Sequence, residues 1–155
     1  LTHSHKRSRS LTHTHIQARP QRKKDGSTNL LVWDCGVPGQ KDTAWEGGTY
    51  LVQLNFSSDY PTNPPKVKFK PAIFHPNVFS DGAVCLSLLK KNYKFGWKPS
   101  ITIPQILTAL QALLTGPNLN DPANGAAADL ARKDKAAYER KIKAQAKDYA
   151  SDDVL

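Results

Sequence analysis

Apolar and polar positions alternate along the first half of the chain with the two-residue period of β-strands. The alternation begins near residue 16 and is interrupted by turn-forming pairs at Asp25-Gly26, Pro38-Gly39 and Gly47-Gly48. The predicted inward-facing residues of the later strands are Leu31, Trp33, Cys35 and Val37, then Tyr50, Val52, Leu54 and Phe56, and then Val67 and Phe69. Short strands joined by tight turns favour an antiparallel meander, here of four strands.

The second half of the chain changes to a helical period. Thr102 and Gln105 stand at the spacing of a capping box, and Gly116-Pro117 ends the segment that follows. The apolar stripe between these signals consists of Ile106, Leu107, Leu110, Leu113 and Leu114. This pattern predicts an amphipathic helix.

Two further helices are predicted after this one. Asp121-Pro122 resembles an N-cap followed by a proline at the first helical position, so a short alanine-rich helix is expected to begin there. The last helix is expected from about residue 134 to residue 149, with a Glu139–Lys143 pair on its basic outer face. Strands followed by helices predict an α+β domain.

Length and composition narrow the class of protein. The 155 residues suffice for one domain with a hydrophobic core. No apolar run approaches the roughly 20 residues of a membrane helix, and no secretion signal is evident. Two cysteines, Cys35 and Cys85, are too few for a disulfide scaffold. We therefore expect a protein of the nucleus and cytoplasm that has no membrane partner.

Much of the net charge of +9 lies in an N-terminal arm. Residues 1–24 hold seven of the 22 basic residues and no acidic one. Residues 1–15 lack apolar periodicity, which predicts a disordered basic tail rich in His and Ser, followed by a domain at residues 16–155. Such a tail would bind nucleic acid or acidic proteins only weakly, through charge. Its H-x-H pairs are more typical of a solvated tail than of a metal site.

Residues 71–100 show no clear period, and long irregular stretches inside a compact domain are usually functional. Cys85 lies in this stretch, whereas Cys35 is expected to pack in the core. A hydrolytic cysteine enzyme normally needs a histidine base beside its thiol, and His75 is the only histidine after residue 15. A thioester carrier has less need of that base, because the acyl group it receives is already activated. The alternative to a reactive cysteine is that Cys85 is buried and unreactive.

The segment Phe74-His75-Pro76-Asn77, with Cys85 eight residues after the asparagine, resembles the active-site segment of the ubiquitin-conjugating enzyme family. The resemblance covers about residues 20–151. Other matching positions are Tyr60-Pro61, Pro64-Pro65, Trp97 and Asp121-Pro122. Within the family, the chain resembles the members that carry SUMO, through Trp33-Asp34-Cys35, Val37-Pro38-Gly39 and Trp45-Glu46-Gly47-Gly48.

The resemblance implies the ubiquitin-conjugating-enzyme fold and a transferase without cofactor or metal. Cys85 would accept the SUMO C-terminus as a thioester from the SUMO-activating enzyme and pass it to a lysine of a substrate protein, with SUMO ligases as further partners. Asn77 would donate to the oxyanion or shape the loop that does so, and Asp121 would orient and desolvate the acceptor lysine. Lys66 and Lys68 would attract an acidic residue that follows that lysine. The resemblance further implies an acceptor groove at Phe79, Pro122 and Gly125, and structural roles at the site for His75 and Pro76.

Each role has a simpler alternative. The only role of Asn77 could be to close a turn, Asp121 could be only a helix cap, and Lys66 and Lys68 could form a solvated strand face. For the whole chain, the alternatives are a ubiquitin-type conjugating enzyme, a non-catalytic binding variant of the same fold, and a nucleic-acid-binding domain that uses the basic tail.

The chain departs from the family's pattern near the site. Phe79 replaces a tyrosine, and Asp81 and Ala83 replace small hydroxyl residues. The segment at residues 90–96 is longer and more basic than in SUMO carriers, so the choice of acceptor is expected to differ. Because residues 1–15 show no amphipathic pattern, the helix with which the family opens is expected to be missing or divergent.

Overall fold

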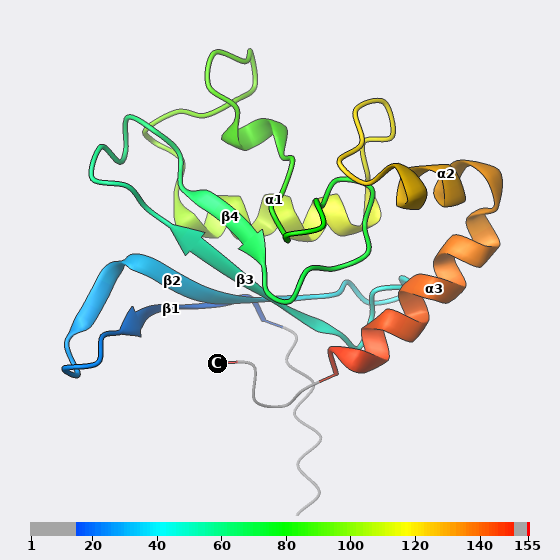
Figure 1. Ribbon diagram of the computed structural model, residues 1–155, viewed down its shortest axis with the longest axis horizontal. Coiled ribbons are helices and arrows are strands. Elements are labelled where there is room, and N and C mark those ends of the chain that lie inside the picture. Colours follow the sequence, from blue (N-terminus) through cyan, green and yellow to red (C-terminus); the bar gives the residue numbers. More distant parts are fainter. Residues whose placement is uncertain (1–14, 151–154) are drawn as a thin grey trace, which may run out of the picture.

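The computed structural model describes residues 15–150 and residue 155 (Figure 1). Its elements in chain order are β1 (Gln17–Arg22), β2 (Thr28–Pro38), β3 (Thr49–Asn55), β4 (Lys66–Phe69), the 3-10 helix η1 (Ser87–Leu89), α1 (Ile103–Thr115), α2 (Gly125–Lys133) and α3 (Lys135–Asp148). The strands form one antiparallel sheet in the order β1-β2-β3-β4, which confirms the predicted meander. The predicted disordered tail, and with it the predicted loss of an opening helix, falls mainly on residues 1–14, which lie outside the described residues.

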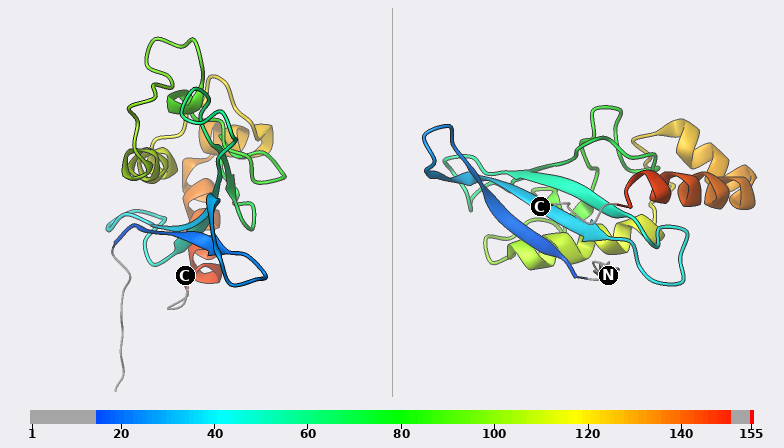
Figure 2. Two further views of the ribbon diagram at one scale, coloured as in Figure 1. Left: turned by 90° about the vertical axis from the view of Figure 1, so that its left-hand side faces the viewer. Right: turned by 90° about the horizontal axis from the view of Figure 1, so that it is seen from below.

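The hydrophobic core lies between one face of the sheet and α1. Tyr50, Val52 and Leu54 on β3 are fully buried, and Val67 and Phe69 on β4 nearly so, as their alternation predicts. Helix α1 runs across this face of the sheet, as Figure 1 and the two views of Figure 2 show. Its buried side chains are Ile106, Leu107, Leu110 and Leu114, whereas Leu113 is only partly buried. Full burial of one such side chain contributes about 1.5–3 kcal/mol.

Strand β2 buries only its second half. Cys35 and Val37 are inaccessible to solvent, but Leu31 is 51% exposed and Trp33 is partly buried. The prediction that Leu31 faces the core is therefore wrong. The end of the β1–β2 hairpin extends beyond α1 in Figures 1 and 2, so no helix covers that part of the sheet.

The start of α1 confirms the predicted capping box. The Thr102 side chain accepts a hydrogen bond from the Gln105 backbone N–H, and the Gln105 side chain accepts one from the Thr102 N–H. These contacts satisfy N–H groups that have no partner within the helix. The helix ends at Gly116, as predicted.

The predicted start of the next helix is wrong. Asn124, not Asp121, is the N-cap of α2, and its side chain accepts a hydrogen bond from Ala127 N–H. Asp121 and Pro122 lie in the irregular segment before the helix. The N–H groups of Ala123 and Asn124 both donate to the Pro76 carbonyl, at 2.8 and 2.9 Å. This tertiary contact delays the helix by three residues relative to the prediction.

Helix α3 begins after the N-cap Asp134 and ends at Asp148, close to the predicted bounds. Glu139 pairs with Lys135 at 3.9 Å and not with Lys143, so the predicted Glu139–Lys143 pair is wrong. Both spacings place the partner one turn away, and an exposed pair of this kind contributes only about 0.3–0.5 kcal/mol. Among the described residues, no helix has the length and apolarity needed to cross a membrane.

Candidate active site around Cys85

A short antiparallel turn brings Cys85 back beside Asn77. Residues Val78 and Val84 form an isolated bridge, and the Cys85 N–H donates to the Asn77 carbonyl at 2.9 Å. Cys85 is partly exposed, whereas the other cysteine, Cys35, is buried. The predicted pairing of Cys85 with the asparagine of the preceding segment is therefore present as a direct backbone contact.

Gly82 permits this turn. Its φ of +87° lies in the left-handed region, which side-chain-bearing residues rarely adopt. A Cβ at this position would also meet the Phe69 carbonyl oxygen at 2.1 Å. Residues 78–84 can therefore pack directly against β4 only with glycine here.

The Asn77 side chain is fully engaged inside the protein. It is 1% exposed; its Nδ2 donates to the Asn118 carbonyl and its Oδ1 accepts from the Asn118 N–H, both at 2.8 Å. This pair of bonds joins the Cys85 segment to the segment that carries Asp121. Of the two roles left open for Asn77, the geometry favours shaping the loop over direct donation to an oxyanion.

His75 joins the same segment to α1. Its Nε2 lies 2.8 Å from the Leu113 carbonyl, and its Nδ1 accepts the Asn77 N–H at 2.9 Å. Both ring nitrogens therefore have partners, and the neutral tautomer with the proton on Nε2 satisfies both. Burial lowers the pKa of His75 to about 4, against the opposing effect of the nearby α1 carbonyls. These contacts support a structural role for His75 and leave it without a free nitrogen to act as a base.

The burial of neutral His75 predicts a pH-dependent loss of stability. Between the ordinary pKa of about 6.5 and about 4, the unfolded chain binds a proton at His75 that the folded chain does not. The free energy of unfolding should therefore fall as the pH decreases through this window, by up to about 3 kcal/mol. Urea unfolding of the native chain and the His75→Gln variant at several pH values measures this, and the variant should show the smaller loss. Parallel profiles for the two proteins would contradict the prediction.

Asp121 lies at the surface beside a lysine. Its side chain is 70% exposed, and its Oδ2 is 3.4 Å from Lys90 Nζ. The carboxylate is therefore open to an incoming side chain, as the predicted acceptor role requires. Pro122 and Gly125, both exposed, continue the segment toward α2.

The predicted basic pair lies on the strand next to the Cys85 turn. Val84 N–H donates to the Val67 carbonyl at 3.2 Å, so β4 borders the turn directly. Lys66 is exposed, whereas Lys68 forms an ion pair with Asp81 at 3.0 Å. Asp81 therefore offsets part of the positive charge that was predicted to attract an acidic residue. Phe79, in the same turn, is 47% exposed.

Aromatic contacts attach the basic segment at residues 90–97 to the rest of the domain. Trp97 Nε1 donates to the Pro61 carbonyl at 2.9 Å, and its ring lies 6.1 Å from that of Tyr60. The Trp97 N–H donates to the Lys90 carbonyl at 2.9 Å, which closes the segment into a loop. Tyr93 and Phe95 in this loop are more than half exposed. The loop, which follows Cys85 and η1 in the chain, therefore presents exposed aromatic groups beside its lysines.

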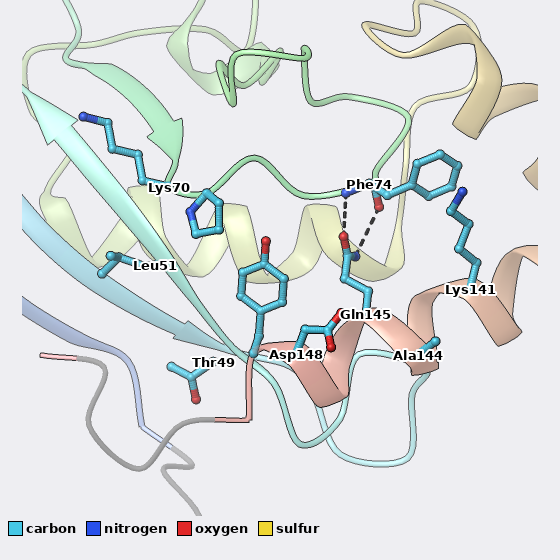
Figure 3. Close-up of a pocket in the computed structure, with 10 residues that line it drawn as sticks. Thr49, Leu51, Lys70, Phe74, Lys141, Ala144, Gln145 and Asp148 are labelled. Atoms are coloured by element: carbon cyan, nitrogen blue, oxygen red, sulfur yellow. Dashed lines mark hydrogen bonds between the residues drawn. The ribbon is translucent and has the colours of Figure 1, made fainter.

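Helix α3 is hydrogen-bonded to Phe74, the residue before His75. Gln145 Oε1 accepts the Phe74 N–H at 2.6 Å, and Gln145 Nε2 donates to the Phe74 carbonyl at 3.4 Å (Figure 3). Lys141 Nζ lies 4.0 Å from the centre of the Phe74 ring. The open hollow drawn in Figure 3 is lined by residues of β3, α3 and the segment before His75, and Cys85 is not among them.

The second cysteine cannot share this chemistry. Cys35 is fully buried on β2, and burial raises the pKa of its thiol to about 12. Almost no thiolate is therefore present at neutral pH. Within the part of the chain that the structure describes, no group of three His, Cys, Asp or Glu residues could hold a metal ion.

The structure adds two residues to the predicted site. Asn118 is the partner of the Asn77 side chain, and Lys90 is the partner of Asp121. Asn118 had no sequence signal, because its contribution is a backbone N–H and carbonyl that any residue possesses. Lys90 did have a sequence signal, since it belongs to the basic segment that follows Cys85.

Comparison with known proteins agrees with this geometry. Residues 1–146 match the family described as ubiquitin-conjugating enzyme. The chain is 47% identical over 135 residues to the SUMO-conjugating enzyme UBC9 of Caenorhabditis elegans, covering 87% of this chain and 80% of that protein. It is 46% identical over 132 residues to the SUMO-conjugating enzyme SCE1 of Arabidopsis thaliana, covering 85% of this chain and 81% of that protein. It is 48% identical over 132 residues to the SUMO-conjugating enzyme ubc9 of Dictyostelium discoideum, covering 85% of this chain and 82% of that protein. The chain has a four-stranded meander and a partly exposed cysteine whose N–H is bound by the asparagine of a His-Pro-Asn segment. Because the family match and the similarity to these relatives agree with this arrangement, we conclude that the chain belongs to the ubiquitin-conjugating enzyme family.

Proposed function

We propose that this chain accepts the C-terminal carboxyl group of SUMO as a thioester on Cys85, from the SUMO-activating enzyme, and transfers it to lysine side chains of substrate proteins. The names of the three relatives support SUMO as the modifier. SUMO ligases are the further class of partner. The matched family is described as ubiquitin-conjugating enzyme, so ubiquitin is the alternative modifier. The loading assay therefore includes ubiquitin.

One observation carries the proposal: a single short segment holds both the nucleophile and the acceptor side of the site. The Asn77 carbonyl binds the Cys85 N–H, while the Asn77 side chain and the Pro76 carbonyl bind the segment at residues 118–124. The thiol and the Asp121 carboxylate are therefore placed by adjoining residues. A transferase that moves an acyl group from sulfur to an amine needs this juxtaposition, because reacting groups must be held within a few tenths of an ångström of productive geometry.

Asp121 would act on the incoming lysine. An ordinary lysine has a pKa of about 10.4, so well under 1% is free amine at neutral pH. A carboxylate beside the thioester can hold the ammonium group in place and accept a proton as the amine attacks. Because Asp121 is exposed and its carboxylate pairs with the movable, half-exposed Lys90 side chain, an acceptor lysine can displace that pair.

Lys66 and Lys68 would select the acceptor by charge. Both lie on β4, which borders the Cys85 turn. They would attract an acidic residue that follows the acceptor lysine, with Lys66 the stronger contributor because Asp81 pairs with Lys68. Phe79, Pro122 and Gly125 are the exposed residues that would line the path of the acceptor side chain.

A loading assay tests the proposal. The chain is mixed with SUMO, the SUMO-activating enzyme and ATP, and with ubiquitin, its activating enzyme and ATP in parallel. The products are then run on non-reducing and reducing gels. We expect an adduct with SUMO that reductant removes, and none with ubiquitin. If a SUMO-conjugating enzyme from one of the relatives loads under the same conditions and this chain does not, the proposal is wrong; an adduct with ubiquitin alone would transfer it to the ubiquitin type.

A further inference from the structure

The carboxylate of Asp81 lies on Lys68, one of the two lysines proposed to select the acceptor by charge. Asp81 Oδ2 is 3.0 Å from Lys68 Nζ, and the two side chains are 58% and 37% exposed. Lys66, the other lysine of β4 in the proposed pair, is exposed and forms no ion pair with any residue that the structure describes. The two lysines are therefore not equivalent, because Lys68 already has an anionic partner from its own chain.

A tight turn holds Asp81 in this position. The Gly82 N–H donates to the Phe79 carbonyl at 2.9 Å, so Asp81 is one of the two central residues of the turn. Asp81 Oδ1 accepts the Ala83 N–H at 3.0 Å, while Oδ2 accepts from Lys68 Nζ. Because the backbone fixes one carboxylate oxygen, the other is directed at the lysine before any substrate arrives.

The turn is joined both to β4 and to the nucleophile. Ala83 forms an isolated antiparallel bridge with Lys68, and Cys85 follows two residues after Ala83 in the chain. The Asp81–Lys68 pair therefore lies on the surface where residues next to an acceptor lysine would pass. The hydrogen bond from the Ala83 N–H, and then the one from Lys68, lower the pKa of Asp81, so its carboxylate is charged throughout the neutral range.

We propose that Asp81 is a specificity-determining residue: it occupies Lys68 in place of the acceptor's own acidic residue, so that lysines followed by a neutral or basic residue are also accepted. This inference rests on the proposed function, because Lys68 can select an acceptor only if Cys85 carries the modifier. A substrate carboxylate that reaches Lys68 must displace Asp81. It then exchanges one exposed ion pair for another and leaves Asp81 unpaired, so almost no net stabilisation results.

The charge of Asp81 acts in opposite directions on acidic and basic acceptors. Its carboxylate repels an acidic residue that follows the acceptor lysine and attracts a basic one. Solvent and salt screen these exposed charges, so the effects on the rate of transfer are modest. A merely structural role of Asp81 in the turn would instead change transfer to both kinds of acceptor in the same direction.

The experiment measures the second-order rate constant for transfer from the purified, SUMO-loaded chain to three peptides. Each peptide has one lysine, and the peptides differ only in one residue after it, which is Glu, Gln or Arg. The Asp81→Asn variant removes the charge but keeps a side-chain oxygen for the Ala83 N–H, so the turn is retained. Relative to the Gln peptide, we expect Asp81→Asn to raise transfer to the Glu peptide about threefold and to lower transfer to the Arg peptide about twofold.

Two further variants complete the test. The matched control Asp129→Asn removes a carboxylate of α2 that is ion-paired and 58% exposed, as Asp81 is, and should leave both ratios at their native values. In a Lys68→Gln background, the gain of Asp81→Asn with the Glu peptide should largely disappear, because the lysine that the substitution would release is absent.

Three results would each overturn the inference: ratios that Asp81→Asn leaves unchanged, ratios that move in the same direction for the Glu and Arg peptides, or a gain of the same size without Lys68. Each of these results still requires transfer to the Gln peptide, so the proposed function would remain intact. If the native chain forms no thioester with SUMO, the proposed function itself fails.

Discussion

Replacing Cys85 by serine should abolish transfer of the modifier and convert the reductant-sensitive adduct into a reductant-resistant ester. Sulfur is a far stronger nucleophile than the oxygen of a serine hydroxyl, which supplies essentially no alkoxide at neutral pH. Once formed, an oxygen ester is also a poorer acyl donor to amines than a thioester. Gels run with and without reductant after incubation with SUMO, its activating enzyme and ATP measure both effects.

Cys35 provides the matched control. Its thiol is fully buried and its pKa is raised to about 12, so Cys35→Ala should load and transfer like the native chain. Removing a buried sulfur costs some stability, so both variants should be compared at a temperature where unfolding experiments show them folded. A native-like, reductant-sensitive adduct on Cys85→Ser would contradict the assignment of the nucleophile, and its loss in Cys35→Ala would move that assignment to the other cysteine.

Replacing Asn77 by alanine should slow transfer to lysine by about 10² and lower the free energy of unfolding by about 1–3 kcal/mol. The substitution removes both hydrogen bonds between the Asn77 side chain and the Asn118 backbone, and each contributes about 0.5–1.5 kcal/mol net, because water can reach the exposed Asn118. The segment that carries Asp121 is then free to shift, and a displacement of about 1 Å at a reacting group can cost about 10² in rate. Single-turnover transfer and urea unfolding give the two values. The backbone carbonyl that holds Cys85 remains, so loading should fall much less.

A small nucleophile separates the two roles considered for Asn77. Hydroxylamine attacks the thioester through the same tetrahedral oxyanion, but it needs neither Asp121 nor an acceptor groove. If Asn77 mainly positions the segment at residues 118–124, Asn77→Ala should leave hydroxylaminolysis nearly unchanged while transfer to lysine falls. If its amide donates directly to the oxyanion, both rates should fall together by about 10²–10³. The engaged amide seen in the structure predicts the first result.

The architecture of the site follows from one turn and its anchors. His75 attaches the turn to α1, Gln145 attaches Phe74 to α3, and Asn77 attaches Cys85 to Asn118. Three elements that are distant in sequence therefore converge on a few residues. Substitutions at these anchors should impair transfer and stability together, whereas substitutions at exposed Asp121 or Lys66 should impair transfer alone.

Much of the fold could be predicted from local pattern. The alternation at Tyr50, Val52 and Leu54 places those side chains on one face because successive residues of a strand point to opposite sides. The capping box at Thr102 and the stop at Gly116 were also predictable, since both depend on residues within one turn of the helix end. The spacing of Asn77 and Cys85 pointed to the candidate site through its resemblance to a known segment.

Each wrong prediction has its own physical cause. Leu31 follows the strand alternation but is 51% exposed, because no helix covers the end of the β1–β2 hairpin. Asp121-Pro122 has the residue types of a helix start, but the Pro76 carbonyl takes two N–H groups just before the helix, and Asn124 caps it instead. Glu139 has possible partners one turn away in both directions, and their energies differ too little for sequence to decide between them.

The sequence by itself determined which residues prefer strand or helix, which faces are apolar and which side chains can do chemistry, because these properties depend on the side chain and its near neighbours. The tertiary structure alone decided that the Asn77 amide is occupied by Asn118 and that Lys90 meets Asp121. These contacts join residues up to 41 positions apart in the sequence. They depend on backbone groups or exposed charges, which every protein possesses. Only the packed arrangement of the chain selects such partners from the many that composition allows.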